Sequence, residues 1–188
     1  MARLIYSAIA SLDGYITDAE GDFEWAAPDE EVHAFINEME RPIGTYLYGR
    51  RMYEVMVAWE TVPEDDGTRA VSRDYATIWR AADKIVYSTR LPAASSSRTR
   101  IEREFEPRAV SELKESAGHD LSIGGPSLAA QAIAMDLVDE IRLILVPVVV
   151  GGGTPALSHG IRCELDLAEE RAFSSGTVYL RYLVKRGR

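Results

Sequence analysis

Three short segments of the sequence combine turns and side chains that suit a phosphate-bearing ligand. Gly49-Arg50-Arg51 lies between a β-rich run and a helical stretch, Ser88-Thr89-Arg90 follows the next β-rich run, and Gly124-Gly125-Pro126-Ser127 again joins strand to helix. Free N–H groups at a helix start favour anions, and arginine adds a forked, charged donor. Ligands of open α/β sheets lie beyond the carboxyl ends of the strands. Three such turns at one sheet edge would therefore suit an extended polyphosphate such as a dinucleotide.

Each turn taken alone also has a purely structural explanation. Glycine after a strand is commonly a turn residue, exposed arginines usually face solvent, and Pro126 suits the first turn of any helix. Their joint occurrence in chain order favours a ligand site. The sequence contains no Gly-x-Gly-x-x-Gly, no Gly-Lys-Ser/Thr loop and no Gly-x-Ser-x-Gly elbow. This argues against a Rossmann fold, an ATP or GTP enzyme and a serine hydrolase.

The apolar pattern predicts the elements that would position these turns. Residues 4–10 are typical of a strand buried on both faces, residues 17–28 of a long loop, and the acidic stretch after Pro28 of a helix start. Strands and helices then alternate as far as residues 140–150. Residues 165–173 and 177–185 form a hairpin signal. We therefore expect an α/β fold with a mainly parallel sheet, helices on both faces and a C-terminal antiparallel hairpin.

Composition limits the classes of function. The 188 residues are 46% apolar and 27% charged, which is typical of one globular domain over residues 1–188. A net charge of −9 argues against a general nucleic-acid surface, and no apolar run reaches the length of a membrane span. Cys163 is the only cysteine, which excludes an internal disulfide and a multi-cysteine metal site. We expect a cytoplasmic protein with a small-molecule substrate, no metal, and no nucleic-acid or membrane partner.

Five segments also carry a family resemblance, and they run in family order over nearly the whole chain. They are Ser11-Leu12-Asp13-Gly14-Tyr15-Ile16, Tyr48-Gly49-Arg50-Arg51-Met52-Tyr53-Glu54, Val86-Tyr87-Ser88-Thr89-Arg90, Ile123-Gly124-Gly125-Pro126-Ser127-Leu128 and Pro147-Val148-Val149-Val150-Gly151-Gly152-Gly153. In these the chain resembles the dihydrofolate reductase superfamily. It is most similar to the branch containing the reductase (C-terminal) domain of the bifunctional riboflavin-biosynthesis deaminase/reductase. The resemblance implies a dihydrofolate-reductase-like fold and an oxidoreductase that uses NADPH.

The resemblance further implies which residues bind that cofactor. Arg50 and the Ser88-Thr89-Arg90 turn would hold the adenosine 2′-phosphate. Gly49, Arg51 and Met52 would meet the pyrophosphate at a helix start. The segment Ile123-Gly124-Gly125-Pro126-Ser127-Leu128 would do so from the other side. Ala8 and Ile16 would flank the nicotinamide, and residues 17–25 would form a lid over it.

Departures from the family pattern bear on the substrate. Relatives usually have threonine where Met52 stands, and folate reducers have a third glycine where Pro126 stands and a tryptophan-proline lid motif that is absent here. The zinc signature of the deaminase half is absent too. The resemblance therefore favours 5-amino-6-(5-phosphoribosylamino)uracil as acceptor, with dihydrofolate or another pterin second. A non-catalytic NADPH-binding dimeric sensor is the alternative of another class.

Two carboxylates are candidates for orienting the acceptor or supplying a proton. Asp13 belongs to an Asp-Gly pair, which is equally typical of a turn. Glu31 lies near the acidic position of folate reducers, although an acidic residue there is more often a helix-start charge than a catalyst. His33 is expected on the surface of that helix. We also expect a homodimer, because residues 140–150 are more apolar than a solvent-facing strand and the riboflavin branch pairs its subunits near there.

Overall fold

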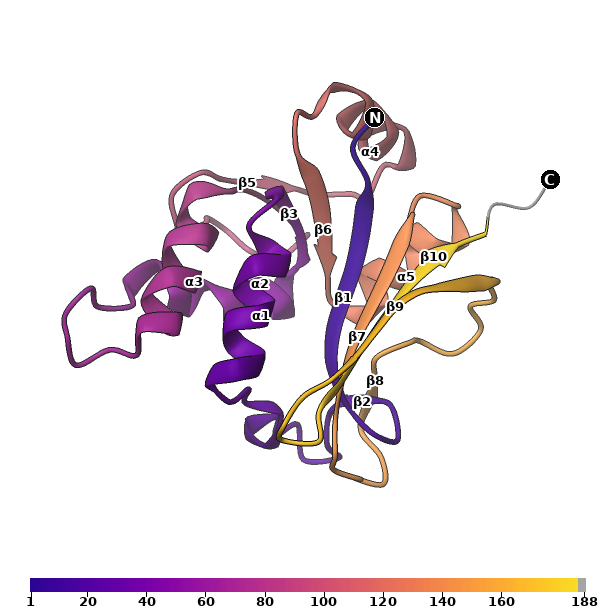
Figure 1. Ribbon diagram of the computed structural model, residues 1–188. Helices are drawn as coiled ribbons and strands as arrows, with labels where there is room; N and C mark the ends of the chain where they lie inside the picture. Colours follow the sequence, from indigo (N-terminus) through magenta and orange to yellow (C-terminus); the bar gives the residue numbers. More distant parts are fainter. Residues whose placement is uncertain (186–188) are drawn as a thin grey trace.

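The computed structural model describes residues 1–185, and a twisted eight-stranded sheet runs through the middle of this part of the chain (Figure 1). The strand order across the sheet is β5-β4-β3-β6-β1-β7-β10-β9. The strands are β1 (Leu4–Ser11), β3 (Ile43–Gly49), β4 (Asp83–Tyr87), β5 (Thr99–Glu102), β6 (Asp120–Gly124), β7 (Glu140–Val146), β9 (Leu165–Ala172) and β10 (Val178–Val184).

Strand direction follows the predicted pattern. The pairs β1–β6, β1–β7, β3–β6, β3–β4 and β4–β5 are all parallel, whereas β10 runs antiparallel to both β7 and β9. The mainly parallel sheet with a C-terminal antiparallel hairpin is thus confirmed. A second, two-stranded sheet pairs β2 (Tyr15–Thr17) with β8 (Thr154–Pro155).

Helices cover both faces of the large sheet, as predicted. They are α1 (Glu30–Glu40), α2 (Arg50–Met56), α3 (Ala70–Ala81), α4 (Pro107–Ser116) and α5 (Pro126–Ala134), with short 3-10 helices at Glu24–Ala26 and Val57–Thr61. Figure 1 shows α1, α2 and α3 grouped together beside the sheet. Ile5, Tyr48 and Val86 pack on that side, whereas Leu4 and Ile123 pack with α4 and α5 on the other. Because neighbouring residues of a strand face opposite sides, an unbroken apolar run such as β1 serves both cores.

The apolar run at residues 140–150, from which we expected a dimer interface, has another explanation in the structure of β7. The strand ends at Val146, and it lies inside the sheet, between β1 and β10, rather than facing solvent. Its apolar residues are therefore accounted for by burial within one chain. The homodimer stays a prediction, and this strand no longer supports it.

The surface position expected for His33 is wrong. Its side chain is only 7% exposed, and its ring lies 6.0 Å from those of Trp59 and Tyr75. Helix α1 packs against α3 as well as against the sheet, so it buries a wider stripe than its apolar residues alone predict.

Candidate active site

The three turns singled out in the sequence follow adjacent parallel strands. In register, Gly49 at the end of β3 stands beside Tyr87 of β4, and Tyr48 stands beside Gly124 of β6. Neighbouring strands lie about 4.8 Å apart, so Gly49, Ser88 and Gly124 share one edge of the sheet within roughly 10 Å. The expectation that these turns meet at one edge is confirmed. We call the three turns, residues 49–52, 88–91 and 124–128, the rim.

The first turn of the rim leads from β3 into α2. Gly49 occupies the N-cap position, and no side chain caps the helix there. Arg50 donates to both carboxylate oxygens of Glu54, at 2.6 and 2.9 Å, and the Arg51 side chain is exposed. This end of β3 thus presents an arginine that is held in place by its own helix.

The second turn is held by hydrogen bonds from within and from a neighbouring loop. Buried Ser88 accepts from the N–H groups of Arg90, at 3.2 Å, and Leu91, at 2.9 Å, through its hydroxyl oxygen. Arg103 donates to the carbonyl oxygens of Ser88 and Leu91 at 2.9 and 2.8 Å. Thr89 and Arg90 are left exposed at the tip of a rigid turn. Sequence reasoning missed Arg103, because nothing local marks an arginine that clamps a turn twelve to fifteen residues earlier.

The third turn requires both of its glycines. Gly125 has a φ of +96°, a conformation that costs other residues energy, and it is the N-cap of α5, with no side chain capping the helix. A Cβ on Gly124 would lie 2.8 Å from the Tyr48 ring and 3.0 Å from Cγ of Met52. Met52 therefore packs beneath this turn.

The remaining members of the third turn divide by burial. Ile123 and Leu128 belong to the core shared with α4 and α5, whereas Pro126 is half-buried and Ser127 is exposed. Only the backbone of Ile123 and Leu128 is therefore available to a ligand at the rim. Ala8 in β1 and Ile16 in β2 are both partly buried.

Asp13 holds the segment after β1 against the glycine-rich loop. Its carboxylate accepts from the N–H groups of Val150, at 3.1 Å, and Gly151, at 2.8 Å. A hydrogen bond from the Ser11 hydroxyl, together with these two N–H groups, lowers the pKa of Asp13, so the carboxylate stays ionised. The geometry gives Asp13 a positioning role, and its part in catalysis stays a prediction.

The predicted lid is a folded segment. Strand β2 pairs with β8, and the Thr17 and Thr154 hydroxyls lie 3.0 Å apart. Asp18 accepts from the N–H groups of Glu20 and Asp22 at 3.0 and 2.8 Å, which closes the tip of the segment. The lid is thus tied to the loop that Asp13 also holds.

A cavity of about 270 Å³ lies between the lid, the start of α1 and the turn of the β9–β10 hairpin. We call it the lid pocket. Ile9 of β1 and Ile144 of β7 line its floor, Trp25 comes from the lid, and Ser175 and Thr177 come from the hairpin turn. Ile9 and Ala8 are neighbours in β1 and face opposite sides of the sheet, so the pocket lies on the α1 side, whereas Ala8 packs on the side of α4 and α5.

Asp29, which the sequence analysis did not select, is the carboxylate that lines this pocket. It caps α1 by accepting from the N–H of Val32 at 2.8 Å. That bond and one from the Ser175 hydroxyl lower the pKa of Asp29. Glu31 instead accepts from the Ser174 hydroxyl at 2.6 Å and lies 3.8 Å from Arg171, so it fixes the hairpin turn to α1. Its predicted catalytic role stays a prediction. The acidic run after Pro28 signals a helix start, but it does not say which carboxylate faces a cavity.

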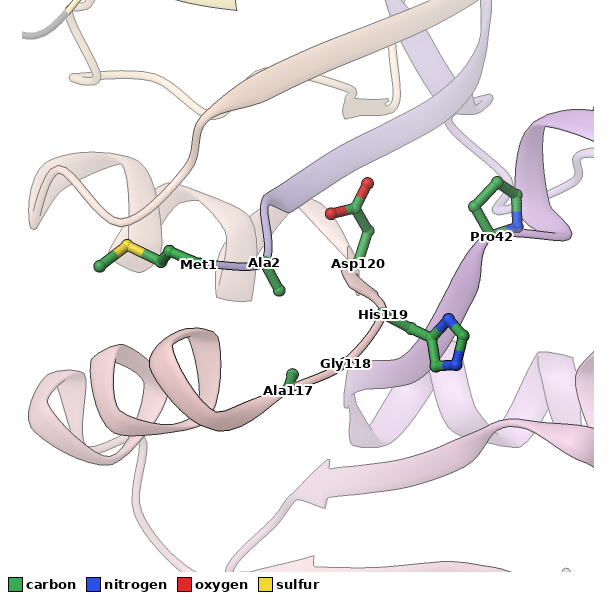
Figure 2. Close-up of a pocket in the computed structure, with 7 residues that line it drawn as sticks. All are labelled: Met1, Ala2, Pro42, Ala117, Gly118, His119 and Asp120. Carbon is green, nitrogen blue, oxygen red and sulfur yellow. The ribbon is translucent and has the colours of Figure 1, made fainter.

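A second cavity, of about 360 Å³, lies at the opposite edge of the sheet (Figure 2). Ala2, Pro42 and His119 line it at the amino ends of β1, β3 and β6, so it is remote from the rim. Among residues 1–185, no group of three or more His, Cys, Asp or Glu side chains could hold a metal ion. None of the described helices is both long and apolar enough to cross a bilayer.

Comparisons with known proteins bear on the same region of the molecule. The chain is 30% identical over 190 residues to YyaP of Bacillus subtilis (strain 168), an alignment that covers 96% of this chain and 94% of YyaP. Among solved structures, it superposes on a Shewanella sp. PV-4 protein named for riboflavin biosynthesis with a TM-score of 0.75 and 19% identity, covering 99% of this chain and 100% of that one. It superposes on a pyrimidine reductase-like protein of Corynebacterium diphtheriae with a TM-score of 0.70 and 17% identity, over 99% and 93% of the two chains.

The structural likenesses, at these identities, establish the fold. The model of one family, described as the RibD C-terminal domain, matches residues 2–179 and so takes in the rim, the lid and the lid pocket. The chain therefore belongs to the RibD C-terminal domain family.

Proposed function

We propose that this protein is an NADPH-dependent reductase that transfers a hydride to a pyrimidine- or pterin-type acceptor. One observation carries the proposal: three phosphate-suited turns share one edge of the sheet, and a pocket that Trp25 of the lid helps to line lies near the carboxyl ends of the neighbouring strands β1 and β7. Membership of the RibD C-terminal domain family supports the reductase class. The pyrimidine reductase-like name of the Corynebacterium neighbour supports the acceptor class.

The residues at the rim fit a phosphorylated dinucleotide. Arg50, Thr89 and Arg90 offer charged and hydroxyl donors for the 2′-phosphate that distinguishes NADPH from NADH. Gly125 leaves the first N–H groups of α5 without a side-chain cap, and these suit a pyrophosphate. Ala8 and Ile16 would face the nicotinamide. NADPH held there would supply the hydride that the reaction needs.

In this proposal the protein orients the cofactor and the acceptor and keeps bulk water away from the reacting atoms. The lid and the apolar side chains of the pocket would limit the entry of bulk water, and cofactor at the rim and acceptor in the pocket would be held in contact. The acceptor carbon of a C=N or C=O group receives the hydride, and the π electron pair moves to the nitrogen or oxygen, which takes a proton. Asp13 and Asp29 both have lowered pKa values and stay ionised, so water supplies that proton in this proposal.

The resemblance and the neighbours' names indicate which acceptors to try first. The phosphorylated candidate is 5-amino-6-(5-phosphoribosylamino)uracil, whose opened ribosyl carbon would become the ribityl carbon of the product. Dihydrofolate or another pterin is the second candidate.

A thermal-shift titration followed by an acceptor panel tests the proposal. Ligand at 100 times its Kd adds about 2.7 kcal/mol, which for a chain of this size raises the Tm by about 5 to 10 °C. We expect NADPH to give such a shift, and NADH to require a much higher concentration. Acceptors are then screened by NADPH oxidation. Absence of any shift with NADPH contradicts the proposal. A shift without oxidation by any pyrimidine or pterin favours the non-catalytic sensor instead.

A further inference from the structure

The lid pocket is poor in charge for a site that would receive a phosphorylated acceptor. Its lining is mostly apolar, with Trp25, Ile9 and Ile144 prominent, and its polar side chains are Asp29, Ser175 and Thr177. Among residues 1–185, no lysine or arginine lines it. Within that part of the chain, the ionisable side chain at the cavity is thus the Asp29 carboxylate.

That carboxylate is fixed in place. Asp29 accepts from Val32 N–H at 2.8 Å as the cap of α1, and Ser175 of the hairpin turn lines the same pocket. The cap keeps the Asp29 carboxylate at the start of α1, beside the cavity. Asp29 is exposed, so its charge is screened by solvent, but a phosphate held next to it in the pocket would still meet a like charge and be repelled.

Two arginines near the start of α1, Arg171 and Arg69, do not place a positive charge in the pocket. Arg171 stacks over Phe35 and Phe173, with its guanidinium carbon 5.0 and 4.7 Å from the ring centroids, and lies 3.8 Å from Glu31. Arg69 is an exposed residue at the start of α3 and makes the smallest contribution to lowering the pKa of Asp29. Neither is among the residues that line the cavity.

The volume of the lid pocket also favours a small acceptor without a phosphate. Pockets for small ligands commonly measure about 300 to 1,000 Å³. At about 270 Å³ the lid pocket is a little smaller, which suits one compact ring system without a charged tail.

We propose that the lid pocket takes an uncharged, unphosphorylated acceptor ring, and that Asp29 is the specificity-determining residue that excludes the phosphorylated form. This inference rests on the proposed reductase function and narrows its acceptor. The proposed hydride transfer and the pyrimidine or pterin ring of the acceptor stay the same, but the acceptor carries no phosphate.

The test uses two matched ligand pairs, each differing only in a phosphate: 5-amino-6-ribosylaminouracil with its 5′-phosphate, and neopterin with its monophosphate. Binding to the full chain is measured by calorimetry after NADPH has been titrated to saturation. We expect at least one unphosphorylated member to bind, and to bind about ten-fold more tightly than its phosphorylated partner. Equal or tighter binding of the phosphorylated members overturns the inference, as does failure of all four ligands to bind. Failure of the preceding NADPH titration contradicts the proposed function instead, so the two failures are distinct.

Asp29→Asn separates charge from folding, because asparagine caps a helix about as well as aspartate. We expect this variant to shift the ratio of affinities toward the phosphorylated ligands by about ten-fold, with little change in Tm. Glu30→Gln is the matched control, since Glu30 is the adjacent exposed carboxylate in the same helix turn, and it should leave the ratio unchanged. An unchanged ratio in Asp29→Asn overturns the role of Asp29. Selective loss of the phosphorylated ligands in Arg69→Ala would show that a phosphate is bound, and would also overturn it.

Discussion

At the scale of single residues, the side chains that shape the rim differ from those that would contact a ligand there. Arg103 and the Ser88 hydroxyl hold the second turn, and Met52 fills the space beneath Gly124. Arg50, Thr89 and Arg90 are presented by turns that these contacts make rigid. A substitution in either set of residues can therefore weaken cofactor binding. Loss of a contact residue should weaken only ligands that carry the chemical group it binds, whereas loss of a residue that holds a turn should weaken all ligands.

Replacing Arg50 with alanine tests such a dependence. Hydrogen bonds to charged groups contribute about 1.5 to 3 kcal/mol, so Arg50→Ala should weaken NADPH binding by about 10- to 100-fold. NADH lacks the 2′-phosphate and should lose much less. The two dissociation constants are measured side by side by fluorescence titration.

Arg41→Ala is the matched control for that experiment. Arg41 precedes β3 as Arg50 follows it, both are paired with glutamates, and their side chains are 46% and 37% exposed. Arg41 lies at the far end of the strand, so its removal should change neither affinity. An equal loss of NADPH and NADH in Arg50→Ala would move Arg50 away from the 2′-phosphate.

Sequence could locate the turns but not every side chain at the site. Gly49, Ser88 and Gly124 were predictable because turn residues after strands are local signals. Asp29 was not distinguished from Glu31, because which one faces the cavity depends on the hairpin turn. Glu31 reaches Ser174, which is 143 residues away along the chain.

At the scale of elements, the lid depends on its pairing with the loop after β7. Gly153 has a φ of +131°, and a Cβ there would lie 2.0 Å from the carbonyl oxygen of Thr17. This contact is with backbone, so no side-chain adjustment can relieve it.

Gly153→Ala should therefore break the β2–β8 pairing. We expect a loss of more than about 2 kcal/mol, or a lid that opens locally and is cut faster by protease. Gly152→Ala is the control, since a Cβ there meets nothing within 4 Å and the backbone is not in the left-handed region. Thermal melts and limited proteolysis compare the two. Identical behaviour would contradict a fixed lid.

The packing of α1 against α3 predicts a pH dependence through His33. Burial lowers the pKa of His33 in the folded protein, and Arg69 adds to this effect. The unfolded chain titrates near about 6.5, so below that pH it binds the proton that the folded chain resists. The stability that neutral His33 supports is present above about pH 6.5 and declines as the pH falls toward the folded pKa.

We therefore expect the Tm of the wild type to fall more than that of His33→Gln between about pH 7.5 and 5.5. Calorimetry at both values measures the double difference, which cancels groups common to both proteins. Equal falls would mean that His33 titrates alike in the two states.

The predicted elements agree with the structure where their signals are local. Strand β1 matches the predicted residues 4–10 to within one residue, and β3, β4 and β6 each end at the turn that the sequence marked, because apolar runs and turn residues are local signals. The end of β7 at Val146, the burial of His33 and the pairing of β2 with β8 each depend on a distant segment. No local pattern predicts them.

At the scale of the whole molecule, the sheet order brings the separate parts of the site together. Strand β6 lies between β3 and β1, which places the third turn next to the first and beside β1, the strand that leads into β2 and the lid. The edge strand β9 is exposed and carries Asp166, Glu169 and Glu170, charges that oppose pairing with another sheet. A dimer would therefore form elsewhere.

The predicted homodimer can still be tested near residues 147–150. Leu12 and Val149 are 64% and 67% exposed, and Leu12 N–H donates to the carbonyl of Val148 at 2.7 Å, so these apolar side chains belong to adjoining segments. We expect light scattering after size exclusion to give a dimer, and Val149→Asp to give a monomer. Met135→Asp, at an exposed apolar residue beyond α5, is the control that should remain dimeric. A monomeric wild type would contradict the prediction.

Hydrogen exchange with and without NADPH is the most direct measurement of whether the three turns form one binding site. The account predicts slower exchange of backbone N–H groups in all three rim segments on binding, and no change around the cavity of Figure 2 at the opposite edge. Protection confined to a single turn, or protection at Ala2, Pro42 and His119 in place of the rim, would contradict it.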